Sequence, residues 1–428
     1  MDHLPEKRMR GLQRVLAKAF GESEAEDVGL RNRILDQALG KVGPQPQYGP
    51  LDLNEETLSR ISRIAEEKAS SADLLAELLA LSAAEREMVV AVEPRFQVYS
   101  LASHALQQCG KAVFHDPVAA RELARLAHAI SEQVDPRTCG GAAALADLQA
   151  YSLAMEGNAF RVSGDLDAAL RLFEEARRVQ EKGGADPDLA ARIDHLEASL
   201  RREFRQYDVA LRLLDRARKT FTALQDHDQK MRTIINRSNV FLVKGDLDEA
   251  IATLRGALGS TGSPELAWTV RHNLVEILNQ SGRPREAAQL FEETRPLYSQ
   301  HTDPLTTCRR IWMEGLIARE LGENLDHAAD LLLQAATRLA EHGYSLDAAL
   351  AGLDLVTVYA KQGQTAEVLR VASDIVQLFQ ACKAHPEALV AFILVHQAAE
   401  KQAVNLSLLS QVASRVKRAS GTYEMAAS

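Results

Sequence analysis

Residues that could carry catalysis or bind a metal are sparse in this chain. The four cysteines, Cys109, Cys139, Cys308 and Cys382, are scattered, and of these only Cys382 has a local histidine partner, His385. A zinc site needs about four ligands and no second Cys/His pair follows, so we expect a core thiol beside a turn histidine. Cys139 precedes two glycines without an adjacent base, which favours a free surface thiol over a nucleophile.

The familiar motifs of nucleotide-binding proteins and hydrolases are also missing. The sequence contains no Gly-x-x-x-x-Gly-Lys-[Ser/Thr], Gly-x-Gly-x-x-Gly, Gly-x-Ser-x-Gly or His-Glu-x-x-His. Paired acids such as Glu174-Glu175 fall on helix faces that we expect to be solvated. We therefore expect no enzymatic activity, no cofactor and no metal. An enzyme whose chemistry is dispersed over several helices is left as a third alternative.

A turn motif of the type Gly-Asp-Leu-Asp-x-Ala recurs along the chain. Near copies begin at Gly164 and Gly245, and weaker copies begin at Gln206, Gly282, Gly322 and Gly363. The equivalent small or apolar positions are separated by 41, 40, 37, 41 and 40 residues; they are Ala169, Ala210, Ala250, Ala287, Ala328 and Val368. A period this regular indicates an array of helical repeats.

With this pattern the sequence resembles the tetratricopeptide repeat (TPR) family, whose unit is two antiparallel helices joined by a short turn. The resemblance covers roughly residues 150 to 383. Its period of about 40 exceeds the common 34, which implies helices about a turn longer. The family's small position in the first helix holds Gly157, Ala198 and Gly315 but departs at Ser238, Val275 and Val356. The resemblance implies an all-α fold, a right-handed superhelical solenoid of helical hairpins.

Capping residues, prolines and glycines predict where helices begin and how the chain divides. Helix starts are predicted at Asp116-Pro117, Asp186-Pro187, Ser263-Pro264 and Asp303-Pro304, and a capping box at Ser82 to Glu85. We expect an N-terminal helical segment over 1–41, a Pro/Gly linker over 42–53, a helical region with a divergent first repeat over 54–149, six TPR-like repeats over 150–383, and a capping helix pair with a tail over 384–428. Within the second region, amphipathic stretches are expected at about 55–69 and 71–81.

The first helices of such an array line its concave surface, so their inner-face residues can be assigned in register with the turn motif. These 36 positions carry seven Arg or Lys against four acids, although the whole chain has a net charge of −9. They also hold five of the nine asparagines. A carboxamide complements an extended peptide backbone, and the resemblance to longer-repeat TPR proteins that bind peptides through inner asparagines implies that role here. The predicted partner-binding residues are Asn158, Arg161, Arg202, Arg232, Asn236, Asn239, His272, Asn273, Asn279 and Arg309.

These inner residues also have a structural interpretation. An asparagine between repeats can bond a helix terminus or water. Trp312 with Met313 can be core filling or an apolar anchor. Both interpretations stay open at this point.

The sequence thus predicts a non-enzymatic scaffold for protein–protein interaction, which binds an extended peptide or partner segment with acidic groups in a basic, Asn-rich concave groove. The alternative is a peptide- or protein-responsive transcriptional regulator that uses the TPR array as its input domain. Lys7, Arg8, Arg10, Arg14 and Lys18 predict a basic N-terminal helix, but no helix-turn-helix follows, so nucleic acid is not the expected partner. A homodimer is left open.

Composition sets the remaining limits. The 428 residues are 46% hydrophobic and only 5% aromatic, and residues that favour helices dominate, which argues against an all-β fold. The net charge of −9 argues against coating nucleic acid or an anionic membrane. The longest apolar run, Ala388 to Val395, is too short to span a bilayer. Together with the scattered cysteines, this predicts a cytoplasmic protein without membrane contact.

Overall fold

The computed structural model describes residues 55–114, 116–184, 186–259, 263–298 and 303–381, together with a few short pieces beyond residue 392. The expected N-terminal helical segment (1–41) and linker (42–53), the Cys382/His385 pair and most of the expected capping pair (384–428) lie outside these residues. The chain divides into two compact units, unit 1 (Met1–Ile234) and unit 2 (Ile235–Ser428). Each unit is described by itself.

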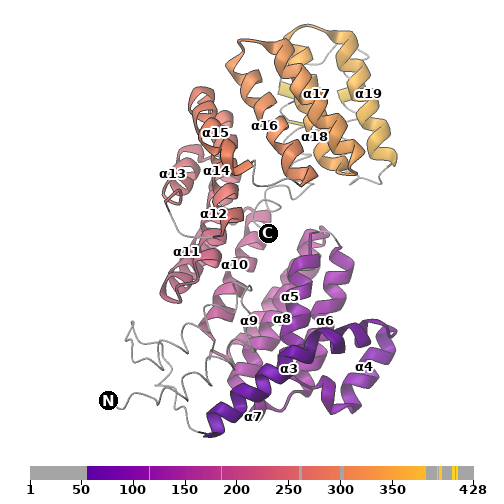
Figure 1. Ribbon diagram of the computed structural model, residues 1–428, viewed down its shortest axis with the longest axis vertical. Coiled ribbons are helices and arrows are strands. Elements are labelled where there is room, and N and C mark those ends of the chain that lie inside the picture. Colours follow the sequence, from indigo (N-terminus) through magenta and orange to yellow (C-terminus); the bar gives the residue numbers. More distant parts are fainter. Residues whose placement is uncertain are drawn as a thin grey trace. The chain divides into compact units, whose positions relative to one another are not determined.

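Unit 1 is a stack of helices joined by short turns (Figure 1). Its helices are α3 (Glu55–Leu79), α4 (Ala83–Val92), the short 3₁₀ helix η1 (Pro94–Phe96), α5 (Tyr99–Ala112), α6 (Pro117–Gln133), α7 (Pro136–Cys139), α8 (Ala142–Val162), α9 (Leu166–Gln180), α10 (Pro187–Glu203) and α11 (Tyr207–Ala223). The pairs α5 and α6, α8 and α9, and α10 and α11 pack as hairpins. Helix α12 (His227–Lys244) runs across the boundary between the units.

Unit 2 continues the hairpin pattern in its own stack. Its helices are α13 (Leu247–Arg255), α14 (Pro264–Gln280), α15 (Pro284–Tyr298), α16 (Pro304–Leu321), α17 (Leu325–Glu341), α18 (Ser345–Lys361) and α19 (Thr365–Ala381). The pairs α14 and α15, α16 and α17, and α18 and α19 pack together, and α17 also packs on α18. The expected all-α solenoid of helical hairpins is confirmed in both units. No helix in the described ranges has the length and apolar character needed to cross a bilayer.

The predicted helix starts are confirmed, because each depends on neighbouring residues alone. Asp116, Asp186, Ser263 and Asp303 all accept a backbone N–H of the first turn, with proline at the first helical position. The capping box from Ser82 to Glu85 is also present at α4. The amphipathic stretches expected at about 55–69 and 71–81 lie along one continuous helix, α3, which ends at Leu79. The hydroxyls of Ser70 and Ser71 bond to carbonyls of the preceding turn, including that of Glu67, so the helix continues through them.

The recurring Gly-Asp motif has a plain structural cause. Gly164 lies between α8 and α9 with φ of 85°, a left-handed conformation that glycine adopts without strain. Asp165 then caps α9, since its carboxylate accepts the N–H of Ala168 at 3.0 Å. Gly245 has φ of 95° at the equivalent turn before α13. In the weaker copy before α11, the non-glycine Arg205 takes the left-handed position with φ of 57°.

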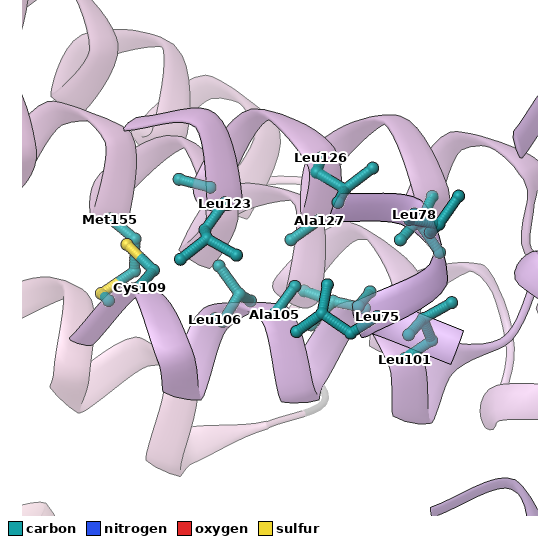
Figure 2. Close-up of a cluster of buried hydrophobic side chains, with 14 of the residues drawn as sticks. Leu75, Leu78, Leu101, Ala105, Leu106, Cys109, Leu123, Leu126, Ala127 and Met155 are labelled. Carbon is teal, nitrogen blue, oxygen red and sulfur yellow. The ribbon is translucent and has the colours of Figure 1, made fainter. Parts of the chain in front are cut away.

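Apolar side chains from α3, α5, α6 and α8 form one core in unit 1 (Figure 2). The cluster includes Leu75, Leu78, Leu101, Ala105, Leu106, Cys109, Leu123, Leu126, Ala127 and Met155. Burial raises the pKa of the Cys109 thiol to about 12, so this cysteine is a core residue and not a reactive one. The helices before residue 142 are therefore packed onto the first strongly periodic hairpin.

Small residues allow the paired helices to approach closely. A Cβ atom on Gly157 would lie 3.2 Å from the ring of Phe173 on α9, and one on Gly315 would lie 2.9 Å from Leu332 on α17. In the last hairpin the family's small position holds Val356, and the close approach occurs one turn earlier. There a Cβ on Gly352 would lie 2.6 Å from Ile375 of α19. The sequence pattern did not identify this shift.

Candidate functional site

Buried polar side chains are concentrated on the first helix of each hairpin. Among the described second helices, α9, α11 and α17 bury only alanine, leucine and phenylalanine. The first helices α8, α10 and α14 also bury polar and charged residues, namely Asp147, Ser152, Glu156, Asn158, Arg161, Asp194, Glu197, Ser199, Arg202, Thr269, Asn273 and Asn279. Among the residues that the structure describes on the second helices (α9, α11, α13, α15, α17 and α19), Thr294 is the one buried polar residue. Apolar packing of the hairpins does not require this asymmetry.

Some of these buried charges hold unit 1 together. On α10, Asp194 lies 2.7 Å from Arg177 of α9 and also pairs with Arg216 of α11. Glu197 lies 2.6 Å from Arg177 and 2.7 Å from Arg201. We call these five residues the α10 ionic cluster. Because its arginines come from α9, α10 and α11, the cluster ties two hairpins together.

Asp147 and Glu156 of α8 also have structural partners. The Asp147 carboxylate accepts the backbone N–H groups of Gly184 and Asp186, both at 2.8 Å, and so fixes the turn before α10. Glu156 accepts a hydrogen bond from Arg125 of α6 at 2.6 Å. These two acids are therefore explained by the packing of unit 1.

In unit 1 the structure brings together three of the predicted partner-binding residues, Asn158, Arg161 and Arg202. Arg161 donates to the Asn158 side-chain oxygen from Nε at 3.0 Å and from Nη2 at 2.8 Å. The same carboxylate oxygen of Glu203 lies 3.9 Å from Arg161 Nη1 and 2.8 Å from Arg202 Nη2. Arg161 and Arg202 thus share one carboxylate between α8 and α10. Arg232, the fourth predicted residue of unit 1, is half-buried on α12.

The predicted asparagines of unit 2 are all buried on first helices. Asn236 and Asn239 lie on α12, and Asn273 and Asn279 lie on α14, with exposed fractions between 2% and 7%. The Oδ1 atom of Asn279 is buried and has no hydrogen-bond donor in the described structure. Such an acceptor costs roughly 1–3 kcal/mol when left unsatisfied, so its retention calls for an explanation.

His272 is held in its neutral form by its surroundings. Its imidazole stacks on the indole of Trp268, with ring centroids 5.0 Å apart and planes 21° from parallel. Burial lowers the pKa of His272 to about 4, with a contribution from Arg309, while Glu276 opposes the shift. At neutral pH the ring can therefore donate one hydrogen bond and accept another without carrying charge.

Acid should destabilise unit 2 through His272. A histidine in the unfolded chain has a pKa of about 6.5, so between that value and about 4 the unfolded chain binds more protons than the folded one. The free energy of unfolding should fall by about 2 kcal/mol between pH 7 and pH 5 from this group alone. His272→Gln should remove that part of the pH dependence. Denaturant titrations at both pH values, followed by tryptophan fluorescence, test this; equal pH slopes for the two proteins would refute it.

The arginines of α16 are paired with aspartates of α18. Arg309 Nη2 lies 3.2 Å from Asp347, and Arg319 Nη1 lies 2.5 Å from Asp354. Trp312 donates from Nε1 to the same Asp354 at 2.9 Å, so this indole makes a polar contact as well as packing. The side chains of Arg309 and Arg319 are only 11% and 14% exposed. Burial at this level requires a paired charge.

These ion pairs place carboxylates of this chain beside Arg309 and Arg319, where the prediction considered only the carboxylates of a partner. Asp347 lies outside the inner positions that the sequence pattern assigned, so its charge was not counted against Arg309. The sequence does carry a signal for such ion pairs, because the two opposite charges are about one repeat apart. Arg161 and Glu203 are separated by 42 residues, and Arg309 and Asp347 by 38. His195 Nδ1 likewise lies 3.3 Å from Thr233 Oγ1, one repeat further along.

Comparisons with known proteins identify the class of fold. No protein-family model matches the sequence, and no curated protein matches it. A Rap protein complexed with competence and sporulation factor superimposes with a TM-score of 0.50 and 11% identity, over 77% of this chain and 90% of that chain. The apo form of RapI gives a TM-score of 0.53 and 13% identity, over 76% and 96%.

A third similar structure is a signal transduction ATPase with numerous domains (STAND) from Pyrococcus horikoshii that carries a tetratricopeptide repeat sensor. It gives a TM-score of 0.51 and 12% identity over 99% of this chain and 66% of that chain. Together the matches show that this chain has a TPR-type helical repeat fold.

Proposed function

We propose that this chain is a non-enzymatic scaffold for protein–protein interaction that binds an extended peptide or a partner segment along its first helices. The observation that carries the proposal is the confinement of buried asparagines to those helices, while α9, α11 and α17 bury only apolar residues. Helix packing alone favours apolar residues at such positions, since asparagine is a mediocre helix former.

Carboxamides suit an extended peptide because they match both groups of its backbone. Each can accept a hydrogen bond from a peptide N–H and donate to a peptide carbonyl. The buried Oδ1 of Asn279 is an acceptor that a peptide N–H would satisfy after a small movement of the side chain. In support, the Rap protein of similar fold is complexed with competence and sporulation factor.

Acidic groups on the partner would bind at Arg161 and Arg202. A partner carboxylate can replace Glu203 there, because Glu203 is the most exposed of the three, with its side chain 34% exposed. Exchange of one carboxylate for another preserves the charge balance of the buried guanidiniums. In the regulator alternative, an N-terminal segment or a separately encoded partner contacts DNA; the basic residues 7–18 lie outside the described structure, so this alternative stays a prediction.

Removal of two asparagines should weaken peptide binding. The full chain is used to select a binding peptide from a random displayed library, and the affinity of that peptide is measured by titration calorimetry. Asn236→Ala combined with Asn273→Ala should lower the affinity by about tenfold or more, because two hydrogen-bonding carboxamides are lost. A selected peptide that binds the double variant as tightly as the original chain would refute the proposal.

Ser238→Ala is the matched control for this measurement. Ser238 is fully buried on the same helix as Asn236, and its hydroxyl donates to the carbonyl of Ile235 at 2.8 Å. Its loss should change stability slightly and leave peptide affinity unchanged. Thermal unfolding of all three proteins separates a loss of binding from a loss of folding.

A further inference from the structure

The outward face of α4 is apolar. Toward the rest of unit 1, α4 buries Val90 and packs on α6. Its opposite face carries Ala84, Met88, Ala91 and Val92, which are all exposed, and Met88 and Val92 are each 67% exposed. We call these four residues the α4 stripe. A helix that is apolar on two opposite faces is expected to be covered on both. Figure 1 shows α4 at the edge of unit 1, beside α6.

Acidic residues border the α4 stripe on both sides. Helical spacing puts Glu85 on one flank and Glu87 on the other, and both are exposed. The basic residue of this helix, Arg86, faces the opposite way and lies 3.2 Å from Glu122 of α6. A second copy of α4 packed on the stripe would bring these glutamates against each other without a counter-charge. The flanks therefore favour an apolar partner with basic edges over self-association.

Residues 7–20 of this chain have that character. Met9, Leu12, Leu16 and Phe20 recur at helical spacing and define one apolar side. Arg8 and Arg10 fall toward the two edges of that side in helical register, where their long side chains could reach Glu85 and Glu87.

The length of the chain also permits this contact. The 34 residues between Phe20 and Glu55 can extend over roughly 110 Å. Helix α3, which separates Glu55 from the start of α4, has 25 residues and is about 37 Å long. We propose that residues 7–20 bind to the α4 stripe within the same molecule. Attachment to the same chain keeps the segment at a high effective concentration near α4.

Photo-crosslinking in the full-length chain tests this proposal. The photoreactive residue p-benzoyl-L-phenylalanine replaces Met88, and the products are mapped by mass spectrometry on a mixture of isotope-labelled and unlabelled protein. The proposal predicts crosslinks to residues 7–20 within one isotope population. Mixed-isotope crosslinks would instead identify a second copy as the occupant. Crosslinks to other residues, or none, would equally overturn the proposal.

Charge exchange makes the test independent of folding defects. Glu87→Lys should lower the yield of the crosslink about threefold, the effect of one surface charge pair. Reversing both borders, with Glu85→Lys and Glu87→Lys on α4 and Arg8→Glu and Arg10→Glu on the N-terminal segment, should restore most of the yield, whereas either half of the exchange alone should lower it. Glu174→Lys, at an exposed position on α9, is the matched control and should leave the yield unchanged. A full exchange that restores no crosslink would contradict the pairing of Arg8 and Arg10 with Glu85 and Glu87.

Discussion

Replacing Asp194 with alanine is expected to lower the free energy of unfolding of unit 1 by about 3 kcal/mol. The Asp194 side chain is 4% exposed and bonds arginines from α9 and α11. Its loss leaves Arg177 with Glu197 alone in the α10 ionic cluster and removes the link from α10 to Arg216. This loss of stability stays near the lower end of the range for breaking a buried ion pair, because the Arg216 side chain is 62% exposed and water can solvate it.

The two tryptophans make this effect easy to locate. Both Trp268 and Trp312 lie in unit 2. Far-ultraviolet circular dichroism should therefore show the destabilisation of Asp194→Ala, while the tryptophan fluorescence transition should move little. Asp215→Ala, which removes an exposed carboxylate 3.8 Å from Arg218, should change stability by less than about 0.5 kcal/mol. Equal effects of the two variants would refute the structural role of the cluster.

Replacing Gly183 with alanine should also lower the free energy of unfolding of unit 1 by roughly 3 kcal/mol, here through the loss of buried hydrogen bonds. The added Cβ would lie against the Asp147 carboxylate, 2.8 Å from its Cγ and 3.1 Å from its backbone nitrogen. Relief of this overlap must displace Asp147 from the N–H groups of Gly184 and Asp186. Asp147 is 1% exposed, so these charge-assisted bonds cannot be replaced by bonds to water.

The adjacent Gly184 provides the control for this variant. A Cβ there would meet no atom within 4 Å, but the backbone φ of 94° disfavours an alanine. Gly184→Ala should therefore cost only about 1–2 kcal/mol, the price of a left-handed conformation. Chemical unfolding of both variants followed by circular dichroism compares the two. If Gly184→Ala proves the more damaging, the proposed clamp by Asp147 is wrong.

Local features of the fold could be predicted from the sequence. A helix start such as Ser263-Pro264 is fixed by a capping side chain and a proline, which act within one turn. The turn at Gly164-Asp165 is likewise local. The continuity of α3 through Ser70 and Ser71 is also local, because both hydroxyls bond to carbonyls inside the helix. The close approach at Gly352 was missed because it depends on Ile375 of another helix.

The candidate site was predicted by residue type but not by partner. Helical spacing assigned Asn158, Arg161 and Arg202 to inner faces, and the structure brings them together. The same spacing gave no sign that Arg309 is held by Asp347, because that contact joins two helices across a repeat. The repeat period would have suggested the pair, since Arg309 and Asp347 are about one repeat apart, but the spacing of inner-face residues within one helix does not contain that information.

Nuclear magnetic resonance of the asparagine side chains tests most directly whether the first helices bind the partner. The chain has nine asparagines, so selective ¹⁵N labelling gives nine carboxamide signals that single substitutions can assign. On addition of a selected peptide, the signals of Asn236, Asn239, Asn273 and Asn279 should shift. The signal of Asn324, which caps α17 by accepting the N–H of His327 at 3.0 Å, should stay in place. Binding that leaves the four inner signals unchanged would contradict the account.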